Sequence, residues 1–442
     1  MTDAIVITGC GAVAPKSLIP LLSPADAQPV SGAYDIPYPG EVTRFDIPET
    51  APSAAFEIDD FDLNAYIPTK HPFIDRASAF ALAASAQALS EAGLLDSEGK
   101  VKDETGCCYG TAFGCLETMA FYADKLKTKA AKFAPPLPFT HSYPNSPSAL
   151  ASIQFGLKGH SVTMAGGNNA GINALATAVS AIKAGRAERV LVVASDALSE
   201  PVWKHLYASR RIASRPPAGA LAVDADGCVP SEGGAAFVIE TESSAKARGA
   251  RIIARLSGYG FSTTPASSEP FDAALSSAWS SGLKSARVRR SEVDVISLSS
   301  PQCPGTDAAE SAFIGSFESV VRADEAALTS GDSASADKPE TGNPSKTTIL
   351  FKSTGQTLAP QGAPALTAVK LWGGEMLSAS PLSAIIASAR LLDGAQHRQS
   401  LPVKLRGVYR PGEREALKLI AIQSLEPVGT AAVVFVSASS FI

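Results

Sequence analysis

The stretch SVTMAGGNNAGINALATAVSAIKAG, Ser161–Gly185, decides the fold of this chain. Its first five residues predict a short strand, and the Gly-Gly pair that follows predicts a turn in which a Cβ would clash. From Ile172 to Ile182 apolar residues recur at helical spacing, and the run RVLVVAS, Arg189–Ser195, predicts another buried strand. This order of strand, turn, helix and strand is a βαβ unit, which implies a parallel sheet with a right-handed crossover.

The rest of the chain follows the same pattern in two halves. AIVITGCGAV near the start predicts a buried strand, and IDRASAFALAASAQALSEAGLL predicts an amphipathic helix that a glycine ends. In the second half VDVISLSS, TTILFKS, LKLIAIQSL and GTAAVVFVSAS predict further strands. We therefore expect an internal duplication, with halves at residues 1–245 and 246–442. Residues 327–346 lack aromatic side chains and are rich in Ser, Asp, Gly and Pro, which predicts a solvated, flexible insertion.

Composition narrows the class of protein. The chain has 442 residues, of which 45% are hydrophobic and 18% charged, and its net charge is −5. A nucleic-acid-binding protein would be basic, so we exclude that class. The six cysteines form neither a CxxC pair nor a Cys/His quartet, which argues against a metal site and indicates reduced thiols. The N-terminus lacks the basic start of a signal peptide and no apolar run reaches about 18 residues, so we expect a cytoplasmic protein without membrane contact.

Several segments resemble those of the β-ketoacyl synthases, a family of the thiolase superfamily. VITGCGAVAP resembles their opening strand, SPSALASIQFGLKGHSVTMAGGNNAG their approach to the nucleophile, and DADGCVPSEGGAAFVIETESSAKARGARIIARLSGYGFS a mid-chain signature. The resemblance covers nearly the whole chain. It implies an α/β protein with the five-layer αβαβα fold of two duplicated halves, and a nucleophile elbow at residues 161–172. It implies no metal and no nucleotide cofactor.

The family's chemistry depends on three side chains, and the resemblance finds none of them here. A cysteine at the elbow takes the acyl group from a carrier protein, and two histidines assist decarboxylation of the extender and stabilise the enolate. The cysteine position falls on Asn168, whose carboxamide cannot form a thioester. Counting back eight residues from Asp307 puts Ser299 at the first histidine position. Gln356 replaces the second histidine in the turn FKSTGQTLAP, which keeps Lys352.

These losses predict a subunit with no catalytic residue of its own. The family's glycine-rich C-terminal loop, which carries a gating Phe, has become SLEPVGTAA, with Leu425, Glu426 and Pro427 in its place. Ketosynthase-like subunits with such an elbow are chain length factors, which pair with an active ketosynthase and shape its acyl tunnel in type II polyketide or fatty-acid-like biosynthesis. We expect that role here, with the Asn168 amide hydrogen-bonded to the backbone N–H groups of the elbow. Two alternatives stay open: a malonyl-carrier-protein decarboxylase that primes synthesis, and a homodimeric pseudoenzyme that binds carrier protein or an acyl ligand.

Basic residues mark candidate contacts with an acyl carrier protein. Lys125, Lys127 and Lys129 lie close together in ADKLKTKAAK, and Arg210 and Arg211 lie in SRRIASRPP. Carrier proteins of this family are acidic, so a basic patch can steer them, although a solvated helix face is the favoured explanation of the lysines. We expect a heterodimer with the active ketosynthase, formed where the strand before the elbow pairs with its counterpart across a twofold axis. The carrier protein then docks on this chain or on the partner alone.

Overall fold

The computed structural model describes most of the chain. The described residues are 3–24, 38–69, 71–129, 131–216, 221, 225–264, 271–300, 302–303, 305–316, 365–368, 370, 375–393, 417–426 and 429–440. The predicted insertion at 327–346, the predicted strand TTILFKS, and the candidate site residues Lys352 and Gln356 lie outside these ranges. Within them, no helix combines the length and the apolar character that crossing a bilayer requires.

Ten of the described strands form one continuous sheet, in the order β10-β9-β11-β12-β8-β1-β7-β6-β4-β5. The strands of the first half are β1 (Ile5–Val13), β4 (Gly106–Thr111), β5 (Ser161–Ala165), β6 (Arg189–Asp196) and β7 (Gly233–Thr241). The strands of the second half are β8 (Ala254–Thr263), β9 (Val295–Ser297), β10 (Ala365–Thr367), β11 (Leu419–Glu426) and β12 (Thr430–Ser437). A second, small sheet pairs β2 (Gly40–Glu41) with β3 (Ala54–Ala55).

The two halves of the large sheet repeat one topology. In the first half β4 pairs in parallel with β5 and β6, and β7 pairs antiparallel with β6 and β1. In the second half β9 pairs in parallel with β10 and β11, and β12 pairs antiparallel with β11 and β8. A short antiparallel contact between β1 and β8 joins the halves. The predicted duplication of the fold is therefore confirmed, whereas the boundary between residues 245 and 246 stays a prediction.

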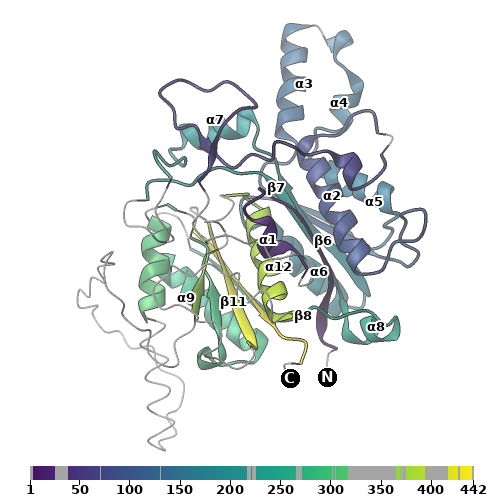
Figure 1. The fold of residues 1–442 in the computed structure, drawn as a ribbon, viewed down its shortest axis with the longest axis vertical. Coiled ribbons are helices and arrows are strands. Elements are labelled where there is room, and N and C mark those ends of the chain that lie inside the picture. The colour runs from purple at the N-terminus through teal and green to yellow at the C-terminus, as the bar shows by residue number, and fades with distance from the viewer. Residues whose placement is uncertain are drawn as a thin grey trace, which may run out of the picture.

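Helices cover the sheet in three layers, so that the two halves of the sheet and the helices make the expected αβαβα arrangement (Figure 1). The outer layer on the first half consists of α2 (Arg76–Glu91) and α5 (Ser146–Phe155). The middle layer consists of α6 (Ala170–Lys183) and α12 (Ala379–Asp393). The outer layer on the second half is α9 (Phe271–Ala286).

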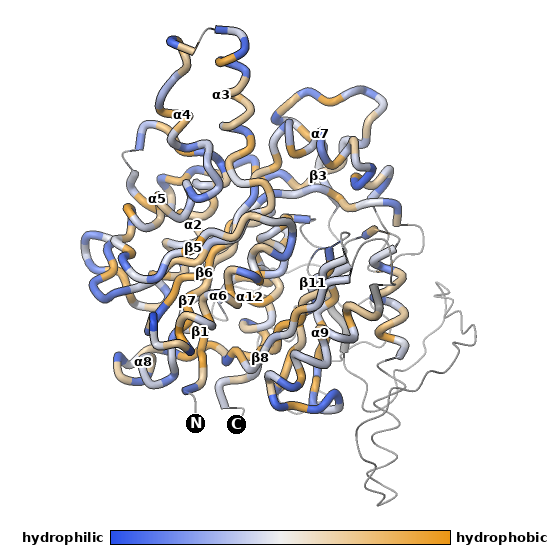
Figure 2. Tube along the Cα trace, turned by 180° about the vertical axis from the view of Figure 1, so that it is seen from behind, coloured by the Kyte–Doolittle hydropathy of each residue, from blue (hydrophilic) through white to orange (hydrophobic). Residues whose placement is uncertain are grey.

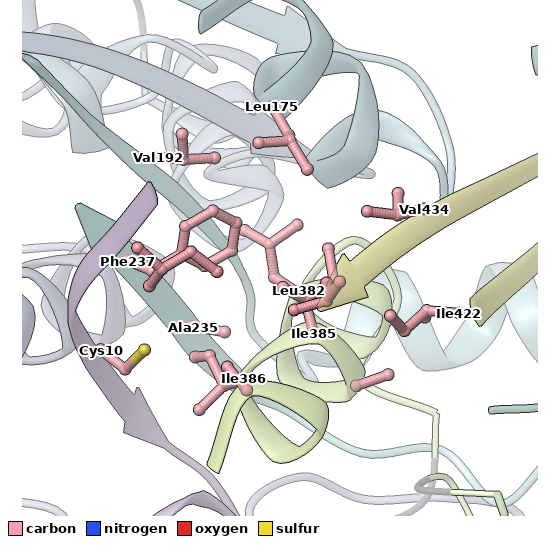
Figure 3. Close-up of a cluster of buried hydrophobic side chains, with 14 of the residues drawn as sticks. Cys10, Leu175, Val192, Ala235, Phe237, Leu382, Ile385, Ile386, Ile422 and Val434 are labelled. Carbon is pink, nitrogen blue, oxygen red and sulfur yellow. The ribbon is translucent and has the colours of Figure 1, made fainter. Parts of the chain in front are cut away.

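The middle layer is the core of the molecule. Leu175 from α6 and Leu382 and Ile385 from α12 pack between Phe237 of β7 and Val434 of β12 (Figure 3). Full burial of an aliphatic or Phe side chain stabilises by roughly 1.5–3 kcal/mol, so this cluster holds α6 firmly between the two halves. Hydrophobic residues accordingly follow the strands of the sheet (Figure 2). The start of α6, where the elbow lies, is thereby fixed relative to the second half.

The remaining described helices lie around this body. They include α1 (Ile19–Leu22), α3 (Leu116–Thr128), α4 (Pro136–Thr140), α7 (Glu200–Ala208), α8 (Glu242–Ala247) and a helical segment at residues 305–316. Figure 1 shows α3 and α4 projecting from the top of the molecule. The strand before the elbow, β5, ends the order of described strands, and its residues are only partly buried. The predicted edge strand is thus observed at one border of the sheet.

Candidate functional site

The elbow is a tight connection between β5 and α6. Gly167 lies in the left-handed region with φ of +64°, which favours glycine. A Cβ on Gly110 of β4 would lie 2.5 Å from the Ala170 carbonyl, so the strand and the first turn of α6 are in backbone contact. A Cβ on Gly171 would lie 2.4 Å from the carbonyl oxygen of Ser378, the residue before α12. Small residues therefore let the start of α6 sit against both β4 and α12.

Asn168 occupies the centre of the elbow, as the sequence predicts. Its side chain is 4% exposed and that of Asn169 is 1% exposed. The described residues offer no hydrogen-bond partner to Asn168 Nδ2, nor to either polar side-chain atom of Asn169. The expectation that the Asn168 amide holds the backbone N–H groups of the elbow has no support in these hydrogen bonds.

The carboxylate of Glu426 makes the contact that we expected of Asn168. The Asn169 N–H donates to Glu426 Oε1 over 2.5 Å, from one half of the molecule to the other. The carboxylate also lies in the space that a side chain at Gly167 would fill. Burial raises the pKa of Glu426, while the Asn169 N–H and the charge of Arg211 act in the opposite direction. An acidic side chain thus fills the elbow, at a position where the sequence indicates only a rewritten loop.

Ser299 connects the loop after β9 to the end of β11. Its Oγ accepts a hydrogen bond of 2.9 Å from the N–H of Leu425, the residue before Glu426. Glu310 holds the same loop by accepting from the N–H groups of Ser299 and Ser300, each over 2.7 Å. Two of the four predicted degenerate positions, Asn168 and Ser299, are therefore linked through the end of β11.

Two buried acids support this loop. Asp307 accepts a 3.0 Å hydrogen bond from the Gln302 N–H. Ser300 and Gln302 have φ of 36° and 60°, a region costly for residues other than glycine, so the carboxylates hold a strained turn. Burial raises the pKa of Asp307 to about 7 and that of Glu310 to about 7. Both acids therefore act as hydrogen-bond acceptors that hold the loop.

Charged side chains surround the Glu426 carboxylate. Lys370 and Glu375 form an ion pair of 2.7 Å, and both act electrostatically on Glu426. Arg211 is half-buried with its Nε lacking a hydrogen-bond partner among the described residues, whereas Arg210 is exposed. Of the two arginines proposed as carrier contacts, Arg211 is therefore the one whose charge acts on the site.

The described cysteines offer no activated thiol. Five of the six are buried, and Cys303 is partly exposed. Burial raises the pKa of Cys107 to about 12, that of Cys108 to about 12 and that of Cys228 to about 12. A thiol with such a pKa is almost fully protonated at neutral pH and is a poor nucleophile. Within the described ranges, no group of His, Cys, Asp and Glu side chains is arranged to hold a metal ion.

The candidate lysines lie on the projecting segment of α3 and α4. Lys127 and Lys129 are exposed, while Lys125 sits 4.9 Å from the centroid of the Phe121 ring and pairs with Asp124 over 3.5 Å. Exposed apolar side chains, which periodicity alone does not reveal, share this segment and define what we name the α3–α4 surface. They are Met119, Phe121, Leu126, Phe133, Leu137, Phe139 and Tyr143. A surface that is both basic and aromatic is typical of a protein interface.

Comparison with known proteins places this geometry in a family. Residues 2–245 match the family model of the beta-ketoacyl synthase N-terminal domain. Over 266 residues the chain is 30% identical to 3-oxoacyl-acyl-carrier-protein synthase 2 from Synechocystis, with 58% of this chain and 62% of that protein covered. Over 318 residues it is 30% identical to an actinorhodin polyketide beta-ketoacyl synthase 2 from Streptomyces coelicolor, with 71% of this chain and 77% of that protein covered.

A solved structure supports the same assignment of fold. The ishigamide ketosynthase/chain length factor has a TM-score of 0.73 against this chain at 20% identity, with 100% of both chains covered. The match to the family model extends over more than half of the sequence. The likeness of the fold to the solved structure extends over the whole chain. The chain belongs to the beta-ketoacyl synthase family.

Proposed function

We propose that this chain is a non-catalytic subunit that acts as a chain length factor. It pairs with an active ketosynthase and completes the acyl tunnel in which a type II polyketide or a related fatty-acid-like chain grows. The condensation then takes place on the cysteine of the partner. The predicted positions of Asn168, Ser299, Lys352 and Gln356 form part of this proposal.

The observation that carries the proposal is the occupancy of the elbow. Acyl transfer needs a nucleophile at this turn, and a carboxamide does not form a thioester. It also needs hydrogen-bond donors that are free to stabilise the oxyanion. Here Asn168 stands in the turn, and the N–H of the next residue already donates to Glu426. A carboxamide in place of a nucleophile and one N–H already occupied both support the proposal.

Two features favour a protein partner. The strand β5 lies at the border of the described sheet with its side chains partly exposed, and such an edge is normally paired or covered. The α3–α4 surface displays apolar side chains, among them Phe133 at 64% exposure and Tyr143 at 46%. Aromatic residues are enriched at protein interfaces. A ketosynthase that covers the β5 edge and part of the α3–α4 surface accounts for both.

Contact with an acyl carrier protein is a further part of the proposal. Lys127, Lys129 and Arg210 are exposed and can attract an acidic carrier. Arg211 is the weaker candidate because it is half-buried and its charge acts on Glu426. The curated relative from Synechocystis carries the acyl carrier protein in its name, which supports this class of partner.

The decarboxylase alternative is less favoured by the geometry. Decarboxylation of a malonyl thioester needs donors that stabilise the enolate oxygen as it forms. A carboxylate at the same place repels that developing negative charge. The position of Glu426 at the elbow therefore argues against priming by this chain.

The test is to isolate the chain with an affinity tag from its native host and to measure the native mass of what copurifies. We expect a one-to-one complex with a cysteine-containing ketosynthase. Phe139→Ala should weaken that complex, whereas Tyr66→Ala, an equally exposed aromatic beside another ring, should leave it intact. A homodimer, or condensing activity from the purified chain alone, would overturn the proposal.

A further inference from the structure

The start of α6 has an unusual occupant. The first N–H groups of a helix have no partner within the helix, and the helix dipole adds partial positive charge there. Such a terminus binds anionic groups and carbonyl oxygens. In this chain it already binds one, because the N-cap residue Asn169 donates from its N–H to Glu426 Oε1.

The chain positions this carboxylate from both sides. Glu426 is the last residue of β11 and is 7% exposed. The Leu425 N–H before it is tied to Ser299 Oγ, and the Gly429 N–H after it donates to the Glu426 carbonyl over 3.0 Å. The backbone that carries Glu426 is therefore fixed against the loop after β9 and by the turn into β12. The side chain can reach the elbow without an ordering step.

The contact with α6 is also the main interaction of the carboxylate. Among the described groups, the Asn169 N–H is its hydrogen-bond donor, and the charges of Arg211 and Lys370 act on it together with the opposing charge of Glu375. Beside it, Asn168 Nδ2 is buried without a partner. If the carboxylate were removed, the Asn169 N–H would lose its acceptor, in a buried turn that already holds the unpartnered amide of Asn168.

We propose that Glu426 is a built-in occupant of the elbow that keeps acyl groups off this subunit. Its carboxylate takes the position at the start of α6 that an acyl carbonyl or a small carboxylate would bind. Removal of the side chain opens an anion site built from the Asn169 N–H and the Asn168 amide. This inference goes beyond the proposed function, because it concerns how the elbow excludes ligand and does not require a partner.

The sequence offers a direct probe of this contact. Asn168–Asn169 is the only pair of consecutive asparagines in the chain. Labelling asparagine with ¹³C at the carbonyl and ¹⁵N at the amide therefore gives a single signal that reports the Asn169 N–H. A charged acceptor moves such a signal strongly, so Glu426→Ala and Glu426→Gln should both displace it. The matched control is Glu375→Gln, which removes a charge from the same surroundings without removing the acceptor.

Ligand binding supplies the second measurement. Acetate, added as the probe, should restore the Asn169 signal of Glu426→Ala toward its wild-type position and should leave the wild-type chain unchanged. A hydrogen bond to a charged group contributes about 1.5–3 kcal/mol, so acetate should bind the variant roughly 10 to 100 times more tightly than it binds wild type. Glu426→Gln keeps the size of the side chain and should bind acetate no better than wild type, because the site stays filled.

Either of two outcomes would overturn the inference. The first is an Asn169 signal that moves no more in the Glu426 variants than in Glu375→Gln. The second is equal acetate affinity of wild type and Glu426→Ala when both give the spectrum of a folded chain. Should Glu426→Ala fail to fold, the signal in Glu426→Gln decides alone. Copurification with a ketosynthase tests the proposed function independently, so the two can fail separately.

Discussion

Ser299 and Ser297 form a pair that tests how much the hydrogen bond between the Leu425 N–H and Ser299 Oγ contributes to stability. Ser299→Ala removes the acceptor of the Leu425 N–H, and both residues are almost fully buried. A buried N–H left without an acceptor destabilises by about 1–3 kcal/mol. Ser297 is equally buried, but its hydroxyl has no partner among the described residues. Ser297→Ala should therefore change the free energy of unfolding by less than about 0.5 kcal/mol, or stabilise slightly.

The assay is urea denaturation of both variants beside wild type, followed by tryptophan fluorescence. Trp279 is fully buried in the core of the second half and Trp203 is buried in the first half, so tryptophan emission follows the unfolding of both. The expected result is a lower midpoint for Ser299→Ala at an unchanged slope, and a wild-type midpoint for Ser297→Ala. Equal midpoints for the two variants would refute the assignment of Ser299 as a positioning residue. A changed Asn169 amide signal in Ser299→Ala would additionally connect the loop to the elbow.

Three further changes have expected outcomes. Burial holds the pKa of Glu310 at about 7 against 4.5 in the unfolded chain, so the folded state binds this proton more tightly. The share of the free energy of unfolding that comes from Glu310 should fall by up to roughly 3 kcal/mol as the pH rises from about 4.5 to above 7. Because the pKa of Asp307 is raised to about 7 as well, Glu310→Gln should reduce the slope in urea titrations at several pH values without abolishing it. Asn168→Cys should react slowly with iodoacetamide, because the neighbouring Glu426 carboxylate raises the pKa of a thiol, and adding Glu426→Gln should speed the reaction at constant pH. Lys127→Glu with Lys129→Glu should slow association with an acidic carrier protein and flatten its salt dependence in stopped-flow measurements, while an unchanged rate would leave the two lysines as a solvated helix face.

Much of the fold follows from local pattern. The strand, the Gly-Gly turn and the helix of Ser161–Gly185 are found where their periodicity predicts them, because β5 and α6 are regular and α6 is buried on one face. The strand predicted from VDVISLSS is shorter, since β9 ends at Ser297 and the chain then turns through Ser299 and Ser300. The periodicity of the sequence does not show where the strand ends, because Leu298 continues the buried run. The turn is held by Asp307 and Glu310, which come later in the chain.

The sequence likewise indicates some residues of the candidate site and not others. Asn168 and Ser299 could be singled out by position in a motif, because the resemblance aligns each with a residue that the family places at a fixed offset. The contact of Glu426 with Asn169 could not be predicted from the sequence, because it joins residues 257 positions apart and depends on how β11 ends against α6. The exposed aromatic side chains of α3 and α4 were missed for another reason: an apolar residue in a helical segment is equally compatible with a core face.

The residues at the elbow fit one another, which bears on the loss of catalysis that we propose. Ser299 holds Leu425, Leu425 precedes Glu426, and Glu426 holds the N–H of Asn169 beside Asn168. A histidine at position 299 lacks the hydroxyl that accepts from Leu425, and a thiolate at position 168 would lie beside a carboxylate that repels its charge. Each substitution therefore suits the others and would impair a working active site. Under the proposed function, the elbow of this chain is a closed structural joint between the two halves rather than a ketosynthase site that lacks only a sulfur atom.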